Sequence, residues 1–401
     1  MDDNILVVNC GSSSLKLAIF DGNLESVAHG LAERLSTNEA IAKVRTDHQE
    51  TLTLPPNADH QAALVGLIEH FQSAGVLSST PLAIGHRVVH GGEDFTDAAL
   101  ITPKVIEAID HCSALAPLHN PVNLIGIDAA RSLFPDVPQV AVFDTAFHQS
   151  LPPSAFHYAL PKRFYSEWGV RRYGFHGTSH QYMAGEAARL LGQPLEETSI
   201  ISAHLGNGCS ITAIHNGRSV DTSMGLTPLE GLVMGTRSGD IDPGLFDFLM
   251  GKGLTAKEIH RILNQESGLL GLSGETNDMR TLSERAEAGH ADSQLAIDVF
   301  CFRLARYIGA MMVSLDQLDA LVFTGGIGEN SASVRAQTLT HLSLLGFRLD
   351  KTTNTNHGRE SDHRISDTRS RFPVLVIPTN EELVIARSAL DHSRLPVSSN
   401  G

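Results

Sequence analysis

Two arginines of this chain lie in segments that can bring a cation close to an anionic ligand. Arg87 is part of a strand-like segment, Gly85 to Glu93, that ends in two glycines, and Arg237 is part of the glycine-rich segment Met234 to Gly244. A guanidinium in such a place can bind an oxyanion through two parallel hydrogen bonds. We predict that both arginines bind an anion, and a solvated structural arginine remains the alternative for each.

Three histidines stand beside glycines, and they call for different interpretations. His86 and His90 are four residues apart, but the segment reads as a strand and no third ligand follows, so we do not expect zinc there. His176 lies between two glycines in Tyr173 to His180, a setting that core packing does not explain. Because glycines allow a substrate to approach closely, we predict that His176 faces the substrate.

Two carboxylates follow strand-like runs. Asp144 comes directly after the apolar residues of Val140 to Phe143, and Glu381 follows the last strand-like segment. In open α/β sheets ligands bind outside such strand ends, and carboxylate oxygens are ligands of Mg²⁺. Asp144 is therefore a candidate for holding Mg²⁺ or its water, with a helix or turn cap as the alternative, and Glu381 is a second candidate.

Four turns are rich in glycine or small polar residues. Asn9 to Lys16 carries one glycine, three serines and Lys16, so it can contact phosphate, although it leads into a strand and is no P-loop. An ordinary hairpin is the alternative. His204 to Gly208 offers backbone amides to phosphate in the same way. Asn277 to Arg280 and Gly325 to Glu329 are turns that can flank a purine and a ribose.

Two hairpins must position the first two of these turns. Residues Ile5 to Phe20 read as one hairpin and Ile200 to Gly217 as another, and in each a glycine opens the turn, an Ala-Ile pair follows, and a further glycine stands eleven residues after the first. This similarity suggests an internal duplication. Two related halves imply a cleft in which both turns face one ligand.

The remaining pattern alternates strand-like and helical segments, which predicts an α/β fold. Helices are expected over Ala62 to Phe71, Val122 to Leu133 and Ala296 to Leu315, and a strand over Leu318 to Phe323, with Asn330 or Ser331 capping the next helix. The polar residues 350–370 are expected to form an exposed loop. We predict domains at 1–144 and 145–381, with a C-terminal helix at about 382–401 that packs back on the first domain and a frayed tail.

Composition excludes several kinds of partner. The 401 residues carry a formal charge of −15 without a dense Lys/Arg cluster, so neither nucleic acid nor an anionic membrane is expected. No apolar run approaches the ~20 residues of a membrane span, and the start does not resemble a signal peptide. The cysteines at 10, 112, 209 and 301 are scattered, which is typical of reduced thiols. We predict a soluble cytoplasmic protein that binds small molecules.

Taken together, the segments resemble the acetate kinase family over nearly the whole chain: NCGSSSLK, GHRVVHGGE, FDTAFH, RRYGFHGTSH, HLGNGCS, MGTRSGDIDPG, TGGIGEN and PTNEEL. The resemblance implies two duplicated actin-like ATPase domains, of the ribonuclease H-like fold that sugar kinases, actin and heat-shock ATPases share. It also implies ATP and ADP as co-substrates, acetate and acetyl phosphate as the other substrates, Mg²⁺ with Mn²⁺ as its alternative, and a homodimer.

The resemblance assigns a role to each candidate residue. It implies that Asp144, His176 and Arg237 are catalytic and that Asn9 and Glu381 are associated with the metal. Substrate binding is implied for Arg87, and for the apolar residues Val89, Leu118, Phe175 and Pro228 as the pocket for the substrate methyl. ATP binding is implied for Lys16, His204, Leu205, Gly206, Asn207, Gly208, Asp278, Met279, Arg280, Gly325, Gly326, Ile327, Gly328 and Glu329.

The chemistry of the substrate bears on the mechanism. A carboxylic acid with a pKa near that of Glu, about 4.3, is already ionised at neutral pH, so no general base is needed. We therefore expect Asp144 to orient Mg²⁺ or its waters, and transfer to be direct and in line; a phosphorylated Glu381 is the mechanistic alternative. The functional alternatives are a propionate or other short-chain acyl kinase and, more remotely, an actin-like ATPase without a carboxylate substrate.

Overall fold

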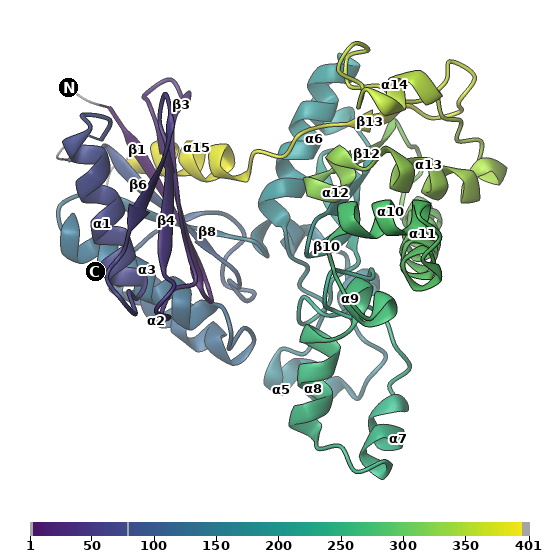
Figure 1. Ribbon diagram of the computed structural model, residues 1–401, viewed down its shortest axis with the longest axis horizontal. Helices are drawn as coiled ribbons and strands as arrows, with labels where there is room; N and C mark the ends of the chain where they lie inside the picture. The colour runs from purple at the N-terminus through teal and green to yellow at the C-terminus, as the bar shows by residue number, and fades with distance from the viewer. Residues whose placement is uncertain (1–2, 78–79, 395–401) are drawn as a thin grey trace. The chain divides into compact units, whose positions relative to one another are not determined.

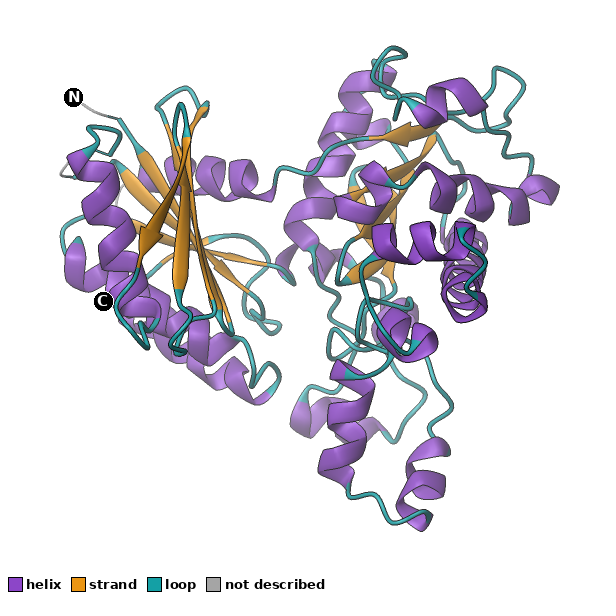
Figure 2. Ribbon diagram, viewed as in Figure 1, coloured by secondary structure: helices purple, strands orange, loops and turns teal. Residues whose placement is uncertain are grey.

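The computed structural model describes residues 3–77 and 80–394, and the chain divides into two compact units. Unit 1 comprises residues 1–149 and 380–401, and unit 2 comprises residues 150–379. Each unit has a β-sheet with helices packed against it (Figures 1 and 2). Unit 1 is therefore built from both ends of the chain, whereas unit 2 is one continuous segment.

The sheet of unit 1 has eight strands in the order β5-β4-β3-β2-β1-β6-β8-β7. Strands β1 to β5 form an antiparallel meander, and β6 and β8 continue from β1 as parallel neighbours. The strands are β1 Ile5–Gly11, β2 Ser14–Phe20, β3 Ser26–Glu33, β4 Ile41–Arg45, β5 Gln49–Thr53, β6 Ala83–Val88, β7 Ala99–Leu100 and β8 Gln139–Phe143. The helices are α1 His60–Ser73, α2 Pro103–His111, α3 Asn120–Leu133 and α15 Glu381–Ser393.

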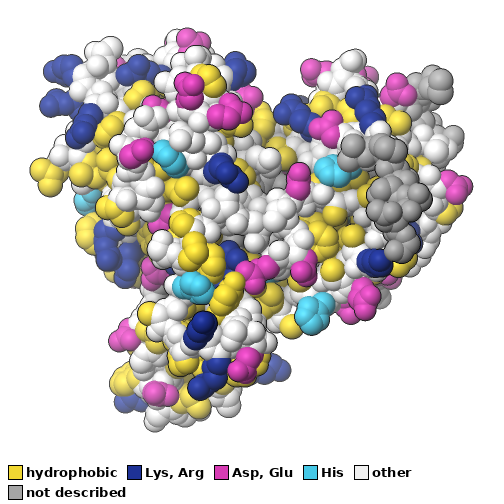
Figure 3. Space-filling view, turned by 180° about the vertical axis from the view of Figure 1, so that it is seen from behind, with side chains coloured by type: hydrophobic (Ala, Val, Ile, Leu, Met, Phe, Trp, Pro, Cys, Tyr) yellow, Lys and Arg dark blue, Asp and Glu magenta, His cyan; other side chains and the backbone are white. Residues whose placement is uncertain are grey.

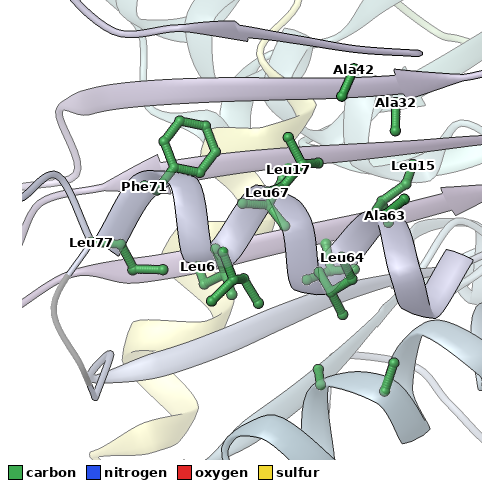
Figure 4. Packing of buried hydrophobic residues seen from close by; sticks show 14 of the residues in the cluster. Leu6, Leu15, Leu17, Ala32, Ala42, Ala63, Leu64, Leu67, Phe71 and Leu77 are labelled. Carbon is green, nitrogen blue, oxygen red and sulfur yellow. The ribbon is translucent and has the colours of Figure 1, made fainter. Parts of the chain in front are cut away.

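Both faces of the central strands are covered by helices, which explains why β1 reads as an unbroken apolar run. Leu6 and Val8 belong to the core cluster that α1 and α3 cover, while Ile5 and Val7 belong to the cluster that α15 covers. Successive side chains of a strand point to opposite faces, so a strand buried on both sides needs apolar residues at every position. Figure 4 shows the first cluster, in which Leu64, Leu67 and Phe71 of α1 pack against the strands.

The sheet of unit 2 has five strands in the order β11-β10-β9-β12-β13. The strands are β9 Ile200–Leu205, β10 Cys209–His215, β11 Arg218–Thr222, β12 Ala320–Thr324 and β13 Val374–Val376. The helices are α4 Pro153–Phe156, α5 Lys162–Trp168, α6 Gly177–Leu191, α7 Leu245–Gly251, α8 Ala256–Gln265, α9 Gly268–Ser273, α10 Met279–Glu287, α11 Ala291–Met311, α12 Gly325–Asn330, α13 Ala332–His341 and α14 Lys351–Thr355. Helix α6 packs on β9 and β12, and α11 contacts β10.

The two sheets share one strand plan. In unit 1 the antiparallel strands β3, β2 and β1 are followed by the parallel strands β6 and β8, and in unit 2 the antiparallel strands β11, β10 and β9 are followed by the parallel strands β12 and β13. The two predicted hairpins, β1-β2 and β9-β10, occupy equivalent places in this plan. The predicted α/β fold with two duplicated domains is confirmed.

Several local predictions can be compared with the elements. Ser331 is the residue that caps α13, and the long helix starts at Ala291, five residues before its predicted start. The expectation of an exposed loop at 350–370 is wrong in part, because α14 lies there and Asn354 is buried. The C-terminal helix ends at Ser393, and the predicted extension over 395–401 lies outside the described residues.

Three further observations concern the surface charges, the helices and the cysteines. Lys and Arg side chains are interspersed with Asp and Glu on the face shown in Figure 3. Within residues 3–77 and 80–394, no helix combines the length and the apolar character needed to cross a membrane. All four cysteines are buried and free of disulfides.

Candidate active site

Three predicted site residues of unit 1 lie at the ends of neighbouring parallel strands. Asn9 is near the end of β1, Arg87 near the end of β6, and Asp144 directly after β8. Parallel strands present their carboxyl ends at one edge of a sheet, and ligands of open α/β folds bind at that edge. Glu381 is the first residue of α15, and its charge also acts on Arg87. Unit 1 therefore brings these four residues into one neighbourhood.

Arg87 and Asp144 form a two-point ion pair. Nε of Arg87 donates to Oδ1 of Asp144 at 3.0 Å, and Nη2 donates to Oδ2 at 2.6 Å. Asp144 is almost fully buried, whereas the arginine side chain keeps 23% of its surface exposed. Burial acts to lower the pKa of Arg87, but the charge and hydrogen bonds of Asp144, together with the charge of Glu381, outweigh burial and hold this pKa above the ordinary value. The carboxylate thus holds a permanent cation at the sheet edge.

A pair of buried asparagines, which sequence reasoning missed, fixes the segment after Arg87. Oδ1 of Asn123 accepts from the backbone N–H of Val89, and Oδ1 of Asn120 accepts from that of His90, both at 3.1 Å. The amide of Asn123 also donates to the carbonyl of Cys10 in β1. Two asparagines three residues apart in the otherwise apolar first two turns of α3 were the available signal, because buried amides need partners.

The oxygen donors of unit 1 suit a hard cation. Asn9, Asp144 and Glu381 supply one amide and two carboxylates, and Mg²⁺ in phosphate sites is commonly held by one or two carboxylates with the substrate phosphates. No group of three or more His, Cys, Asp or Glu able to hold a metal occurs in the part of the chain that the structure describes. Lys16 lies opposite Asn9 in the β1-β2 ladder and is exposed.

In unit 2, His176 and Arg237 meet beside the backbone of Gly208. A Cβ atom placed on Gly208 would lie 2.8 Å from Nη2 of Arg237 and 3.4 Å from Nε2 of His176. The glycine therefore leaves the space in which these two groups approach the β9-β10 turn. His176 adopts the left-handed conformation with φ of 57° at the start of α6. A guanidinium and an imidazole in this arrangement can stabilise the charge of a phosphoryl group.

The loop that carries Arg237 is held by its own backbone and by its neighbours. Nη1 of Arg237 donates to the carbonyl of Pro228 at 2.6 Å, and burial lowers the pKa of the guanidinium. Gly235 donates its N–H to the carbonyl of Asn207 at 2.9 Å. Gly239 has φ of 67°, and a Cβ there would lie 2.4 Å from the carbonyl oxygen of Leu232. Arg237 is therefore held in a closed loop that depends on glycine.

A cavity of about 750 Å³ lies beside the β9-β10 turn. It is lined by residues of that turn, of the start of α10 and of α12, including the predicted nucleotide contacts Gly206, Asn207, Asp278, Met279, Arg280, Gly326 and Ile327. The side-chain amide of Asn277 donates to Oδ1 of Asn207 at 2.8 Å and joins two of these walls. Unit 2 thus brings together three segments that the sequence places far apart.

Other predicted nucleotide contacts serve the fold in this structure. Oε1 of Glu329 accepts from the backbone N–H groups of Gly325 and Thr379, at 2.9 and 3.0 Å. Leu205 is fully buried in β9, and a Cβ on Gly325 would lie 2.8 Å from the Leu205 carbonyl oxygen. His204 is nearly buried and bonded to Ser179, and Gly328 is buried in α12.

The four predicted pocket residues are divided between the units. In unit 1, Val89 is buried and Leu118 is 55% exposed; in unit 2, Phe175 is buried and Pro228 is half-buried.

The histidines near Arg87, His86 and His90, are both buried in unit 1. His86 is bonded to Oε1 of Gln139 at 2.8 Å, and burial lowers its pKa to about 4.

The duplicated strand plan, with polar groups at strand ends and glycine-rich turns beside them, defines the class of two-domain α/β kinases and ATPases built on actin-like domains. The acetokinase family model matches residues 4–387. The acetate kinase of Pseudomonas aeruginosa is 54% identical over 96% of this chain and 98% of its own length, and that of Deinococcus deserti is 53% identical over 95% and 96%.

Solved structures of acetate and propionate kinases also match this chain. A propionate kinase from Francisella tularensis matches with a TM-score of 0.93 and 44% identity over 97% of this chain and 99% of its own. An acetate kinase from Porphyromonas gingivalis matches with a TM-score of 0.90 and 39% identity, over the same shares. The chain belongs to the acetokinase family, an enzyme family of phosphotransferases, which confirms the resemblance found in the sequence.

Proposed function

We propose that this chain is an acetate kinase that reversibly transfers the γ-phosphate of ATP to acetate. The observation that carries the proposal is the placement of Nη2 of Arg237 and Nε2 of His176 around Gly208, in a chain with 54% identity to an acetate kinase. These groups can stabilise the charge of a transferred phosphoryl group. They lie beside Gly208, in the same turn as Gly206 and Asn207, which line a cavity large enough for a nucleoside.

Direct transfer requires little covalent chemistry from the protein. The carboxylate of the substrate is the nucleophile, so positioning and charge stabilisation carry the reaction. Arg237 and His176 donate hydrogen bonds to the equatorial oxygens of the phosphoryl group, and Arg87 binds an anionic substrate group while Asp144 fixes the plane of its guanidinium. Inversion of configuration at phosphorus is the expected outcome, and retention would support a phosphorylated Glu381 instead.

The metal proposed for this reaction is Mg²⁺, with Mn²⁺ as a substitute. Asn9, Asp144 and Glu381 would hold it, directly or through water. When bound, the cation neutralises charge on the nucleotide phosphates. Asp144 then has two tasks, since both of its oxygens also accept hydrogen bonds from Arg87.

Trapping of acyl phosphate with hydroxylamine tests the proposal. Purified protein, ATP and Mg²⁺ are expected to form hydroxamate when acetate is added and none when it is omitted. Arg237→Ala is the matched negative control. ATP hydrolysis that does not respond to acetate would overturn the proposal and favour an actin-like ATPase.

A propionate kinase is the second candidate, because a solved propionate kinase is 44% identical to this chain. One methylene in an apolar pocket separates two substrates by only about 1–3 kcal/mol. Values of kcat/KM for acetate, propionate and butyrate, measured in one assay, decide between the two. A larger kcat/KM for propionate than for acetate would replace the first proposal with the second.

We also propose that the enzyme is a cytoplasmic homodimer. Four apolar side chains of α7 are exposed: Leu245, Phe246, Phe248 and Met250. A short helix with so many exposed apolar residues is typical of a surface that another protein covers. The four buried free cysteines agree with a reducing compartment.

A further inference from the structure

A row of four polar side chains leads from the centre of unit 2 to His176. Oγ of Ser202 in β9 is 2.9 Å from Nδ1 of His180 in α6, and Nε2 of His180 is 2.7 Å from Oγ of Ser210 in β10. The same Ser210 oxygen is 2.9 Å from Nδ1 of His176. One serine hydroxyl thus joins two imidazole rings.

When both rings are neutral and the Ser210 hydroxyl donates within the row, two arrangements of protons are possible. A hydroxyl has one hydrogen, so Ser210 can donate to only one of the two ring nitrogens and accepts from the other when that nitrogen carries a proton. In the first arrangement Ser202 donates to His180, His180 donates through Nε2 to Ser210, and Ser210 donates to Nδ1 of His176. The proton of neutral His176 then lies on Nε2. In the second arrangement Nδ1 of His176 donates to Ser210, Ser210 donates to His180, and His180 donates to Ser202. Nε2 of neutral His176 then carries no proton.

The surroundings of Nε2 favour the first arrangement. Nε2 of His176 lies on the side of the ring that faces Gly208, where Nη2 of Arg237 also lies. A lone pair at Nε2 would repel an anion bound by Arg237, whereas an N–H there would donate a hydrogen bond to it. An anionic phosphoryl group therefore selects the arrangement in which Ser210 donates to His176.

We propose that Ser210, oriented by His180, is a positioning residue that keeps the proton of His176 on Nε2, so that the neutral ring donates to the transferred phosphoryl group. This inference rests on the proposed function and deepens it. Ser202, His180 and Ser210 are all fully buried, so surface water does not compete with these hydrogen bonds. The buried row thus fixes which nitrogen of the His176 ring carries the proton.

The first test compares two substitutions in β10 that each remove one buried hydroxyl. Ser210→Ala is expected to lower kcat about 10- to 100-fold, as loss of a residue that orients a catalytic ligand does elsewhere, while the KM values for acetate and ATP stay within about twofold. Thr212→Val is the control, because Thr212 is a buried hydroxyl of the same strand that bonds to Thr222 instead. It is expected to keep the kcat of the wild type.

Substitutions of His180 provide a second test that does not depend on Ser210→Ala folding. Gln can place an amide N–H where Nε2 of His180 lies, so His180→Gln is expected to retain more kcat than His180→Phe, which has no donor. Equal kcat values for the two variants would overturn the role of His180.

Nitrogen-15 NMR of labelled protein reads the proton directly, without turnover. The His176 signals are identified by their loss in His176→Asn, and the wild type with bound ADP and inorganic phosphate is expected to show a protonated Nε2 and a bare Nδ1. Ser210→Ala is expected to show a mixture of tautomers. An unchanged tautomer, or a wild-type kcat in Ser210→Ala, would overturn the proposal. Failure of the proposed function looks different, since the wild type would then form no acyl phosphate from acetate.

Discussion

At the scale of single residues, the missing side chain of Gly208 decides how close the Arg237 guanidinium and the His176 imidazole come to the β9-β10 turn. Gly208→Ala places a Cβ 2.8 Å from Nη2 of Arg237, closer than ordinary packing allows, so the guanidinium must move. Because loss of one such donor costs on the order of 10²–10³ in turnover, we expect kcat to fall by about 10²-fold. Steady-state kinetics measures this.

Gly185→Ala is the control for this change. Gly185 lies in α6, the helix that starts after His176, and a Cβ there meets no atom within 4 Å. Alanine is favoured over glycine in a helix by roughly 1 kcal/mol, so this variant should be active and slightly more stable. Equal activity of the two variants would contradict the part given to Gly208.

A second prediction at this scale concerns the charge of Asp144, which pairs with Arg87. Asp144→Asn keeps the size of the side chain but removes the charge that opposes Arg87. We expect turnover to fall on the order of 10²-fold and a higher Mg²⁺ concentration for half-maximal rate. Asp136→Asn, an exposed carboxylate in the turn before β8, is the control. Near-normal turnover with normal Mg²⁺ dependence in Asp144→Asn would refute both tasks of this residue.

Two buried histidines of unit 1 make stability depend on pH. Burial lowers the pKa of His86 and of His90 to about 4, from 6.5. Between these values the unfolded chain binds more protons than the folded one, so stability is full above pH 6.5 and falls as the pH drops toward 4. Each histidine contributes a slope of at most about 1.4 kcal/mol per pH unit. Urea denaturation between pH 4.5 and 7 measures it, and His86→Gln should flatten the curve.

At the scale of elements, Glu230 anchors the segment that carries both Pro228 and Arg237. Its Oε1 accepts from Nη2 of Arg172 at 2.7 Å, and its Oε2 accepts from the hydroxyl of Tyr158. Nη1 of Arg172 in turn donates to the carbonyls of Thr222 and Ser223 at the end of β11. The loop is therefore tied to the sheet through one carboxylate.

Glu230→Gln tests this anchor. Leaving a half-buried arginine without its charge partner is expected to cost about 1–3 kcal/mol of stability, and kcat should fall because the Arg237 loop loosens. Glu186→Gln, which breaks the exposed ion pair with Arg189 in α6, should leave the stability nearly unchanged, because water screens exposed ion pairs. Urea unfolding and initial rates report the two effects, and equal stability losses would show that Glu230 is no anchor.

The elements also show how far the sequence predicts the molecule. The hairpins, the long helix α11 and the cap at Ser331 follow from periodicity and turn residues, which act over a few neighbours. The hydrogen bonds of Glu329 and Ser210 could not be predicted in this way. Their partners, Thr379 and His180, are 50 and 30 residues away in the sequence. The helix within 350–370 was missed for the same reason: Asn354 is buried because it accepts a hydrogen bond from Arg335, and no local pattern reports that contact.

At the scale of the whole molecule, the exposed apolar side chains of α7 bear on assembly. If this helix contributes to the proposed homodimer, Phe248→Asp places a charge where a partner surface must be dry, and we expect the dimer to dissociate. Sedimentation velocity of the wild type and the variant measures this. Leu344→Asp, at a residue that is 95% exposed, is the control and should leave the mass unchanged. A Phe248→Asp protein with the mass of the wild type would exclude α7 from the interface.

The packing of α15 has a consequence for synthesis of the protein on the ribosome. Ile385, Ala386, Ala389 and Leu390 cover the face of the unit 1 sheet formed by residues such as Ile5 and Val140, so this face lacks its cover until α15 has been translated. Unit 2 is a continuous segment that is translated before α15, so it can fold before the strands of unit 1 are covered by that helix. A nascent chain that stalls before residue 380 therefore exposes an apolar sheet face, the kind of surface that chaperones bind.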